Sequence, residues 1–150
     1  MASVQDVAAY ILAKESPMSA MKLQKLCYFA YGYHLAWEDR QLFPERFEAW
    51  ANGPVVKELY ARHRGRFNLD RGDIPGDPTA LDDNERDSVN VVLENFRTFD
   101  AHELSAMTHQ PGPWLDARTR AGATDLQRSN EELRDEEIAD FFGALVGRED

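Results

Sequence analysis

The chain has 150 residues, with 17 basic and 27 acidic side chains and a formal net charge of −10. This length suits a single domain, and 43% hydrophobic residues supply enough apolar surface for a core, which excludes a disordered chain. One cysteine excludes an internal disulfide and a zinc site built from several thiolates. The negative charge argues against nucleic acid and anionic membranes as general partners, because both bind clustered Lys and Arg.

The charge is unevenly distributed along the chain. Residues 1–75 carry 10 basic and 9 acidic side chains, whereas residues 76–150 carry 7 and 18. The N-terminal segment has Asp6 where a secretion signal needs basic residues. The longest apolar run, from Leu26 to Trp37, is shorter than the roughly 20 residues that span a bilayer. We therefore expect a cytoplasmic protein without a membrane segment.

Two helices are predicted at the start of the chain. Ser3 and Asp6 have the spacing of a capping box, and the helix that follows must end before Pro17. Ser19 predicts the cap of a longer helix that continues to about Glu38. This second helix is apolar nearly all round, which is typical of a helix at the centre of a domain.

The middle of the chain has a different pattern. Dense aromatic residues predict a small β element near 47–51. Pro54 follows a strong break and is predicted to occupy the first position of a third helix. Residues 65–80 are rich in Gly, Pro and Asp, which predicts a surface loop with a second β element near 66–69.

The second half is predicted to be helical. Asp82, Asp100 and Asp135 are placed to cap three helices, and Pro113 suits the first position of another. The fold class predicted from these elements is a mainly α, single domain over residues 1–150. Its helices should surround the buried central helix at about 20–38.

Little in the sequence points to catalysis or to a bound metal. His102 and His109 lie seven residues apart, whereas metal ligands on a helix usually lie three or four apart. Cys27 falls on the apolar stripe of the central helix, which indicates a buried structural thiol. We assign no catalytic, cofactor or metal residues. The alternative is a small acid/base enzyme of unknown substrate that uses a carboxylate with His34 or His109, and it requires a converging set of such groups.

Two charged groups are candidates for contact with a protein partner. Each also has a structural explanation, since bases near a helix C-terminus and acids near an N-terminus offset the helix dipole. The basic group consists of Lys57, Arg62, Arg64 and Arg66, and Arg71 lies close to it in the sequence. This group leaves a DNA-binding regulator as a second alternative. The acidic group consists of Glu131, Glu132, Glu136 and Glu137.

Four segments, in order, resemble a known family. They are Met21–Gly32, Phe47–Val55, Leu104–His109 with Pro113 and Trp114, and Glu137–Phe142. Together they resemble the Panacea domain, also called the SocA-like or GepA-like antitoxin domain. The resemblance extends over nearly the whole chain.

The resemblance implies a mostly helical antitoxin that neutralises a protein toxin by direct binding. At least one relative also delivers its toxin to a AAA+ protease, and the chain after Leu145 could serve such a presentation. Some relatives carry an added DNA-binding domain, which we do not expect in this chain because the signature begins so early. We interpret the residues of the family signature as structural. They are Lys22, Leu23, Gln24, Lys25, Tyr28, Trp50, Gly53, Pro54, His109 and Trp114.

Overall fold

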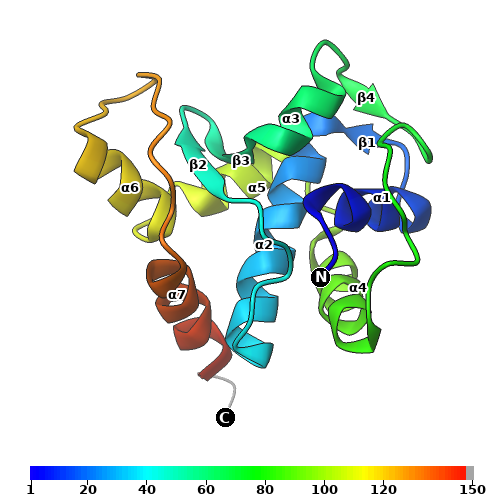
Figure 1. Cartoon of the computed structure of the whole chain (residues 1–150). Helices are drawn as coiled ribbons and strands as arrows, with labels where there is room; N and C mark the ends of the chain where they lie inside the picture. The colour runs from blue at the N-terminus through cyan, green and yellow to red at the C-terminus, as the bar shows by residue number, and fades with distance from the viewer. Residues whose placement is uncertain (148–150) are drawn as a thin grey trace.

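One long helix runs through the middle of the molecule and the other elements surround it in the computed structural model, which describes residues 1–147 (Figure 1). The helices in this part of the chain are α1 (Val4–Lys14), α2 (Ala20–Glu38), α3 (Lys57–His63), α4 (Asp83–Phe96), α5 (Ala101–Thr108), α6 (Pro113–Ala121) and α7 (Asp135–Gly147). The strands are β1 (Met18–Ser19), β2 (Phe47–Trp50), β3 (Gly53–Val56) and β4 (Asn68–Leu69). The predicted mainly α fold is confirmed.

Local capping explains where several helices begin. At Ser3, Asp82 and Asp100 the cap side chain accepts a hydrogen bond from the N–H three residues on, and that residue's carboxylate accepts from the cap N–H. Ser19 Oγ accepts from the N–H of Lys22 at 3.1 Å and so caps α2. These predicted helix starts are confirmed.

Helix α2 forms the centre of the core, as its all-round apolar pattern predicted. It packs against α7 on one side and α4 on the other (Figure 1). The ring of Tyr28 meets those of Phe47 and Phe142 edge to face, with centroids 5.3 and 5.6 Å apart. Aromatic packing therefore joins β2 and α7 to the central helix.

Over the described residues, every helix is too short or too polar to cross a membrane.

The segment after Trp50 differs from the prediction. Gly53–Val56 is not the start of a helix but strand β3, which pairs antiparallel with β2 so that Phe47 faces Val56. Helix α3 begins only at Lys57. Pro54 is tolerated in a strand here because β3 is an edge strand that pairs only with β2 among the described strands, and proline costs little at an edge. The prediction that Pro54 opens a helix is therefore wrong.

The segment 65–80 contains the second predicted β element. Strand β4 at Asn68–Leu69 pairs antiparallel with β1, with Leu69 opposite Met18. Leu69 and Ile74 are buried, whereas most of their neighbours in the segment are exposed. The segment is thus anchored to the core by two apolar side chains.

Helix α7 begins at Asp135. Asp135 is therefore the first residue of the helix, whereas the sequence predicted it as the cap that precedes the helix. The carboxylate of Asp135 accepts hydrogen bonds from Tyr31 at 2.7 Å, Gln41 at 2.8 Å and Arg46 at 2.8 Å. Burial opposes ionisation, but these three hydrogen bonds hold the pKa of Asp135 below its ordinary value. The residue serves as a link between α7 and the end of α2.

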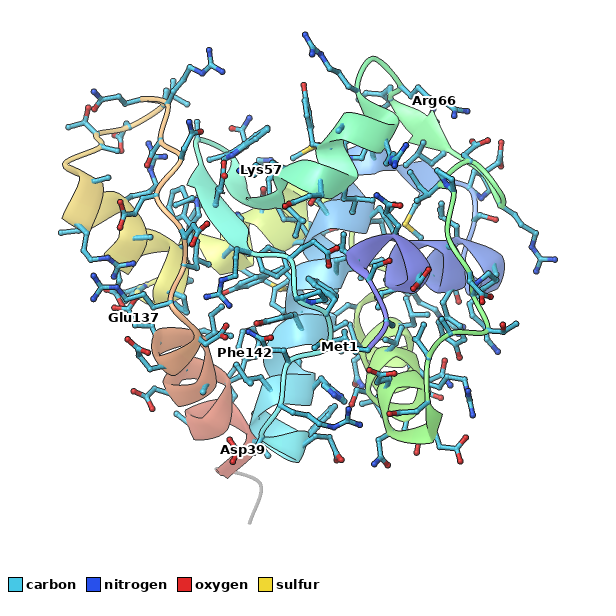
Figure 2. The ribbon with its side chains drawn as sticks, viewed as in Figure 1. Met1, Asp39, Lys57, Arg66, Glu137 and Phe142 are labelled. Atoms are coloured by element: carbon cyan, nitrogen blue, oxygen red, sulfur yellow. The ribbon has the colours of Figure 1, made fainter. Side chains whose placement is uncertain are left out.

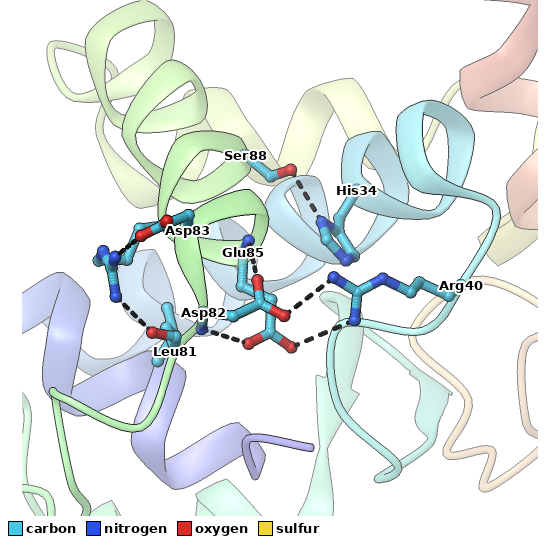
Figure 3. Close-up of polar contacts among 8 residues, drawn as sticks. His34, Arg40, Leu81, Asp82, Asp83, Glu85 and Ser88 are labelled. Carbon is cyan, nitrogen blue, oxygen red and sulfur yellow. Dashed lines mark hydrogen bonds and ion pairs between the residues drawn. The ribbon is translucent and has the colours of Figure 1, made fainter.

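Polar contacts join the end of α2 to the start of α4 (Figure 3). His34 Nδ1 lies 2.8 Å from Ser88 Oγ, and Arg40 donates to the Asp82 carboxylate at 3.0 Å. Arg40 also lies 4.0 Å from Glu85. The two capping carboxylates of α4 thus share one guanidinium.

Candidate protein-binding site

The buried Gln24 of α2 holds strand β3 through its backbone. Its Oε1 accepts from Val56 N at 3.0 Å, and its Nε2 donates to Val56 O at 3.3 Å. The same Nε2 lies 3.0 Å from His63 Nε2, at the end of α3. Gln24 therefore replaces the strand neighbour that β3 lacks on that side.

The next residue of α2, Lys25, is also fully buried. Its Nζ donates to Pro54 O at 3.1 Å. Burial lowers the pKa of the Lys25 ammonium to about 7, because the charged form loses its hydration. An amine in this position holds the hairpin without carrying a full charge at neutral pH.

Gly53 lies against this lysine. Its φ of +126° is a backbone conformation that favours glycine. A Cβ at this position would also lie 2.7 Å from Lys25 Cε and 3.1 Å from Thr108 Oγ1. The backbone of the hairpin can approach α2 and α5 this closely only without a side chain.

The other side of the hairpin is held by α6. Trp114 Nε1 donates to Trp50 O at 2.8 Å, and the buried Arg118 donates to Ala49 O at 2.8 Å. His109 meets the Trp114 ring edge to face, with centroids 4.1 Å apart. Sequence reasoning missed Arg118, because its partners are the backbone carbonyls of Ala49, Thr124 and Gln127, and a carbonyl is present at every residue and gives no sequence signal.

We call Gln24, Lys25, Gly53, Trp114 and Arg118 the hairpin lock. Each of them makes a contact that joins α2, α5 or α6 to the β2–β3 hairpin. The lock fixes the hairpin turn, where Asn52 is exposed. Of the other signature residues, Leu23 and Tyr28 are buried in the core, and Lys22 Nζ donates to Arg97 O.

The basic group lies along α3 and the turn after it. Lys57 is 3.7 Å from Glu48, and Arg66 is 2.9 Å from Asp73, so both are partly neutralised. Arg62 and Arg64 are exposed. The nearby Arg71 donates to Ala13 O at 2.6 Å.

The acidic group lies elsewhere on the molecule, before and at the start of α7. Glu137 and Glu131 lie 2.7 and 3.4 Å from the guanidinium of Arg120. Glu132 and Glu136 are exposed. Figure 2 places Lys57 and Arg66 in the upper part of the molecule and Glu137 at its left edge. Glu132 nevertheless lies opposite Glu48, the ion-pair partner of Lys57, so the two candidate groups approach each other at this point.

The residues considered for acid/base chemistry do not converge on a cavity in the part of the chain described here. His34 and Ser88 contact each other, but both are buried. Among residues 1–147, His34 Nε2 has no hydrogen-bond partner, so no carboxylate orients the ring. Burial lowers the pKa values of His34 and His109. Burial also raises the pKa of the Cys27 thiol to about 12, which disfavours a nucleophilic thiolate. Within residues 1–147, no cluster of His, Cys, Asp and Glu could hold a metal ion.

Comparison with known proteins identifies the family. A family model described as "Antitoxin SocA-like, Panacea domain" matches residues 23–115. The antitoxin SocA of Caulobacter vibrioides is 31% identical over 114 residues, which cover 68% of this chain and 61% of SocA. The chain belongs to the SocA-like Panacea-domain family, as the four sequence segments predicted. No solved structure gives a match.

The matched region contains every residue of the hairpin lock except Arg118, which lies just beyond it. The chain spans only 61% of the length of the curated relative. The family is therefore identified, whereas the partner of this chain has to be argued from its own surface.

Proposed function

We propose that this protein is the antitoxin of a bacterial toxin–antitoxin pair and neutralises a protein toxin by binding it directly. The observation that carries the proposal is the match to the antitoxin family over residues 23–115, the region that builds and holds the β2–β3 hairpin. A masking interface of standard size buries roughly 1,200–2,000 Å² in total. A preorganised surface lowers the entropic cost of forming such an interface, and the hairpin lock would preorganise the hairpin.

The proposal favours binding over catalysis for a physical reason. Gln24 and Lys25, both fully buried in α2, are used to hold backbone. Their burial leaves them out of reach of a substrate. The protein acts, in this proposal, in the bacterial cytoplasm as a single domain over residues 1–150, with 65–80 as a surface loop and without a cofactor.

Expression of the neighbouring gene tests the proposal. If that gene encodes the toxin, its product should stop growth alone, growth should return when this protein is co-expressed, and the two should co-purify. The proposal fails if the wild-type protein gives neither rescue nor co-purification. A catalytic antitoxin would instead rescue growth without a stable complex.

A second role, as an adaptor that delivers the toxin to a AAA+ protease, is also proposed. Its support is the resemblance to a family in which such adaptors occur, together with the C-terminal end after Leu145. Positions 148–150 of that end lie outside the described residues. The toxin's half-life should shorten when this protein is present, and an unchanged half-life removes the adaptor role while leaving neutralisation intact.

The basic and acidic groups remain proposed toxin contacts. Lys57, Arg62, Arg64 and Arg66 would meet acidic groups of the toxin. Glu131, Glu132, Glu136 and Glu137 would attract basic ones. The two groups lie in different segments of the chain, so variants of each group can be tested separately.

A further inference from the structure

Three neighbouring hollows meet at Met21, the second residue of α2. One lies beside the turn after α3, one beside the hairpin turn, and one beside α5, and Met21 lines all three. Tyr60 is shared by the first two and Ala101 by the first and third. The hollows thus form one continuous depressed surface. We call it the Met21 surface and define it by Met21, Trp50, Tyr60, Arg64, Phe67 and Arg128.

The charge of this surface is opposite to that of the protein. Arg64, Arg66 and Arg128 line the hollows, and no Asp or Glu does among the residues described. Arg66 is paired with Asp73. The guanidinium groups of Arg64 and Arg128 are exposed and have neither an ion pair nor a hydrogen bond to any residue within 1–147. In a chain with a net charge of −10, this is a local positive surface.

The same surface exposes apolar side chains. Phe67 is 79% exposed, yet its backbone is held because its carbonyl accepts from Ala20 N at 2.8 Å. Met21, Trp50 and Tyr60 are half-buried beside it. Trp50 and Tyr60 pack edge to face, with centroids 4.9 Å apart. Aromatic groups that are already immobilised lose little entropy on binding, which suits them as interface anchors.

We propose that the Met21 surface is the toxin-contact surface and that it takes a segment of the toxin that carries both apolar and acidic side chains. This inference rests on the proposed antitoxin function and assigns it a place on the molecule. The apolar side chains would enter the hollows beside Phe67 and Tyr60, while carboxylates would pair with Arg64 and Arg128. A peptide fits better than nucleic acid, because two unpaired guanidiniums do not offset the repulsion between a polyanion and a chain of charge −10.

The test uses the full chain and the toxin found by the growth experiment. The double variant Arg64→Glu/Arg128→Glu should release the toxin about tenfold or more faster, because it turns two attractions into repulsions. Phe67→Ser should also speed release. Arg134→Glu is the matched control, since Arg134 is exposed and its guanidinium is unpaired within residues 1–147. Its dissociation rate should match that of the wild type.

A photo-crosslink locates the contact without relying on affinity. The photoreactive amino acid p-benzoylphenylalanine in place of Phe67 should crosslink to a toxin segment rich in Asp or Glu. The same group in place of Val91, which is 40% exposed on α4, should not crosslink.

Three results would overturn the proposal: unchanged dissociation of the double variant, crosslinks from position 91 but not 67, or a crosslinked segment that is basic. Binding of a labelled DNA or RNA duplex that is lost in the double variant would also overturn it, in favour of nucleic acid. Failure of the wild type to rescue growth would instead reject the antitoxin function itself. The two failures are therefore distinguishable.

Discussion

At the scale of single residues, Lys25 couples the fold to pH. Its amine is completely buried and donates to Pro54 O, and burial lowers its pKa to about 7 from an ordinary value of 10.5. In the unfolded chain the lysine stays protonated up to its ordinary pKa. Between these two values the unfolded chain therefore binds more protons than the folded one, and the free energy of unfolding rises with pH.

The variant Lys25→Met should remove this pH dependence. Between about pH 7 and about pH 8.5 the free energy of unfolding of the wild type should rise by on the order of 1 kcal/mol more than that of the variant. Urea unfolding of both proteins at each pH would measure this difference. Burial raises the pKa values of the Cys27 thiol and of the Tyr28 and Tyr31 hydroxyls, but both proteins contain these groups, so their contribution cancels in the comparison.

The control for this prediction is Lys57→Met, since the Lys57 side chain is 61% exposed. The free energy of unfolding of Lys57→Met should change with pH as that of the wild type does. If Lys25→Met and the wild type gain stability in parallel, then the buried amine does not titrate in this range.

Gly53 gives a second prediction at this scale. Gly53→Ala should destabilise the protein by about 2–3 kcal/mol, because it combines an unfavourable φ with a close approach to Lys25 Cε. Gly122→Ala separates these two causes, since Gly122 has a φ of +68° but nothing within 4 Å of an added Cβ. Thermal or urea unfolding should show a loss of only about 1 kcal/mol for Gly122→Ala. Equal losses would mean that the approach to Lys25 costs nothing.

At the scale of elements, the packing of α7 against α2 requires a residue without a side chain at position 32 of α2. A Cβ on Gly32 would collide with the ring of Phe142, which is fully buried between the two helices. The ring of Phe142 also meets those of Tyr28 and Tyr33 edge to face. A glycine in the interior of α2 costs helix stability, and this close packing offsets the cost.

Gly32→Ala should therefore destabilise the protein by about 1–3 kcal/mol despite the better helix propensity of alanine. Gly143→Ala in α7 is the matched control, because nothing lies within 4 Å of its added Cβ, and it should be neutral or stabilising by up to about 1 kcal/mol. Urea unfolding of both variants gives the comparison. In Gly32→Ala/Phe142→Leu the smaller side chain should restore part of the loss, and a purely additive double variant would contradict the collision.

The elements that were predicted correctly are those whose cause is local. The caps at Ser3, Ser19, Asp82 and Asp100 each use a residue and a backbone group three positions away, so their spacing is visible in the sequence. The hairpin was only half predicted, because strand β3 depends on Gln24 and Lys25, about 30 residues earlier. The sequence pattern of residues 53–56 does not indicate these partners.

The same distinction applies to the candidate site. Arg64 and Arg66 were identified as part of a basic run because they are close in sequence. Arg128 and Met21 were not, because only folding brings the loop before Glu131 and the start of α2 to the same hollows. A single sequence shows charge along the chain but not across a surface.

At the scale of the whole molecule, the net charge of the chain and the charge of the Met21 surface have opposite signs. The net charge of −10 acts at long range, whereas the Met21 surface acts on contact. A toxin with a basic body and an acidic docking segment would satisfy both. The long-range part should appear in the association rate, and the contact should appear in the dissociation rate.

Association with such a toxin should therefore slow as salt rises, by about tenfold between low and near-physiological ionic strength. Glu132→Gln/Glu136→Gln removes two exposed charges from the acidic group and should slow association at low salt more than it speeds dissociation. Arg134→Gln, in the same region, should speed association slightly because it removes a repulsive charge. Stopped-flow measurements at several salt concentrations would give both rates. An association rate that is the same at low and high salt would reject steering by the acidic second half, while contact through the Met21 surface would stand.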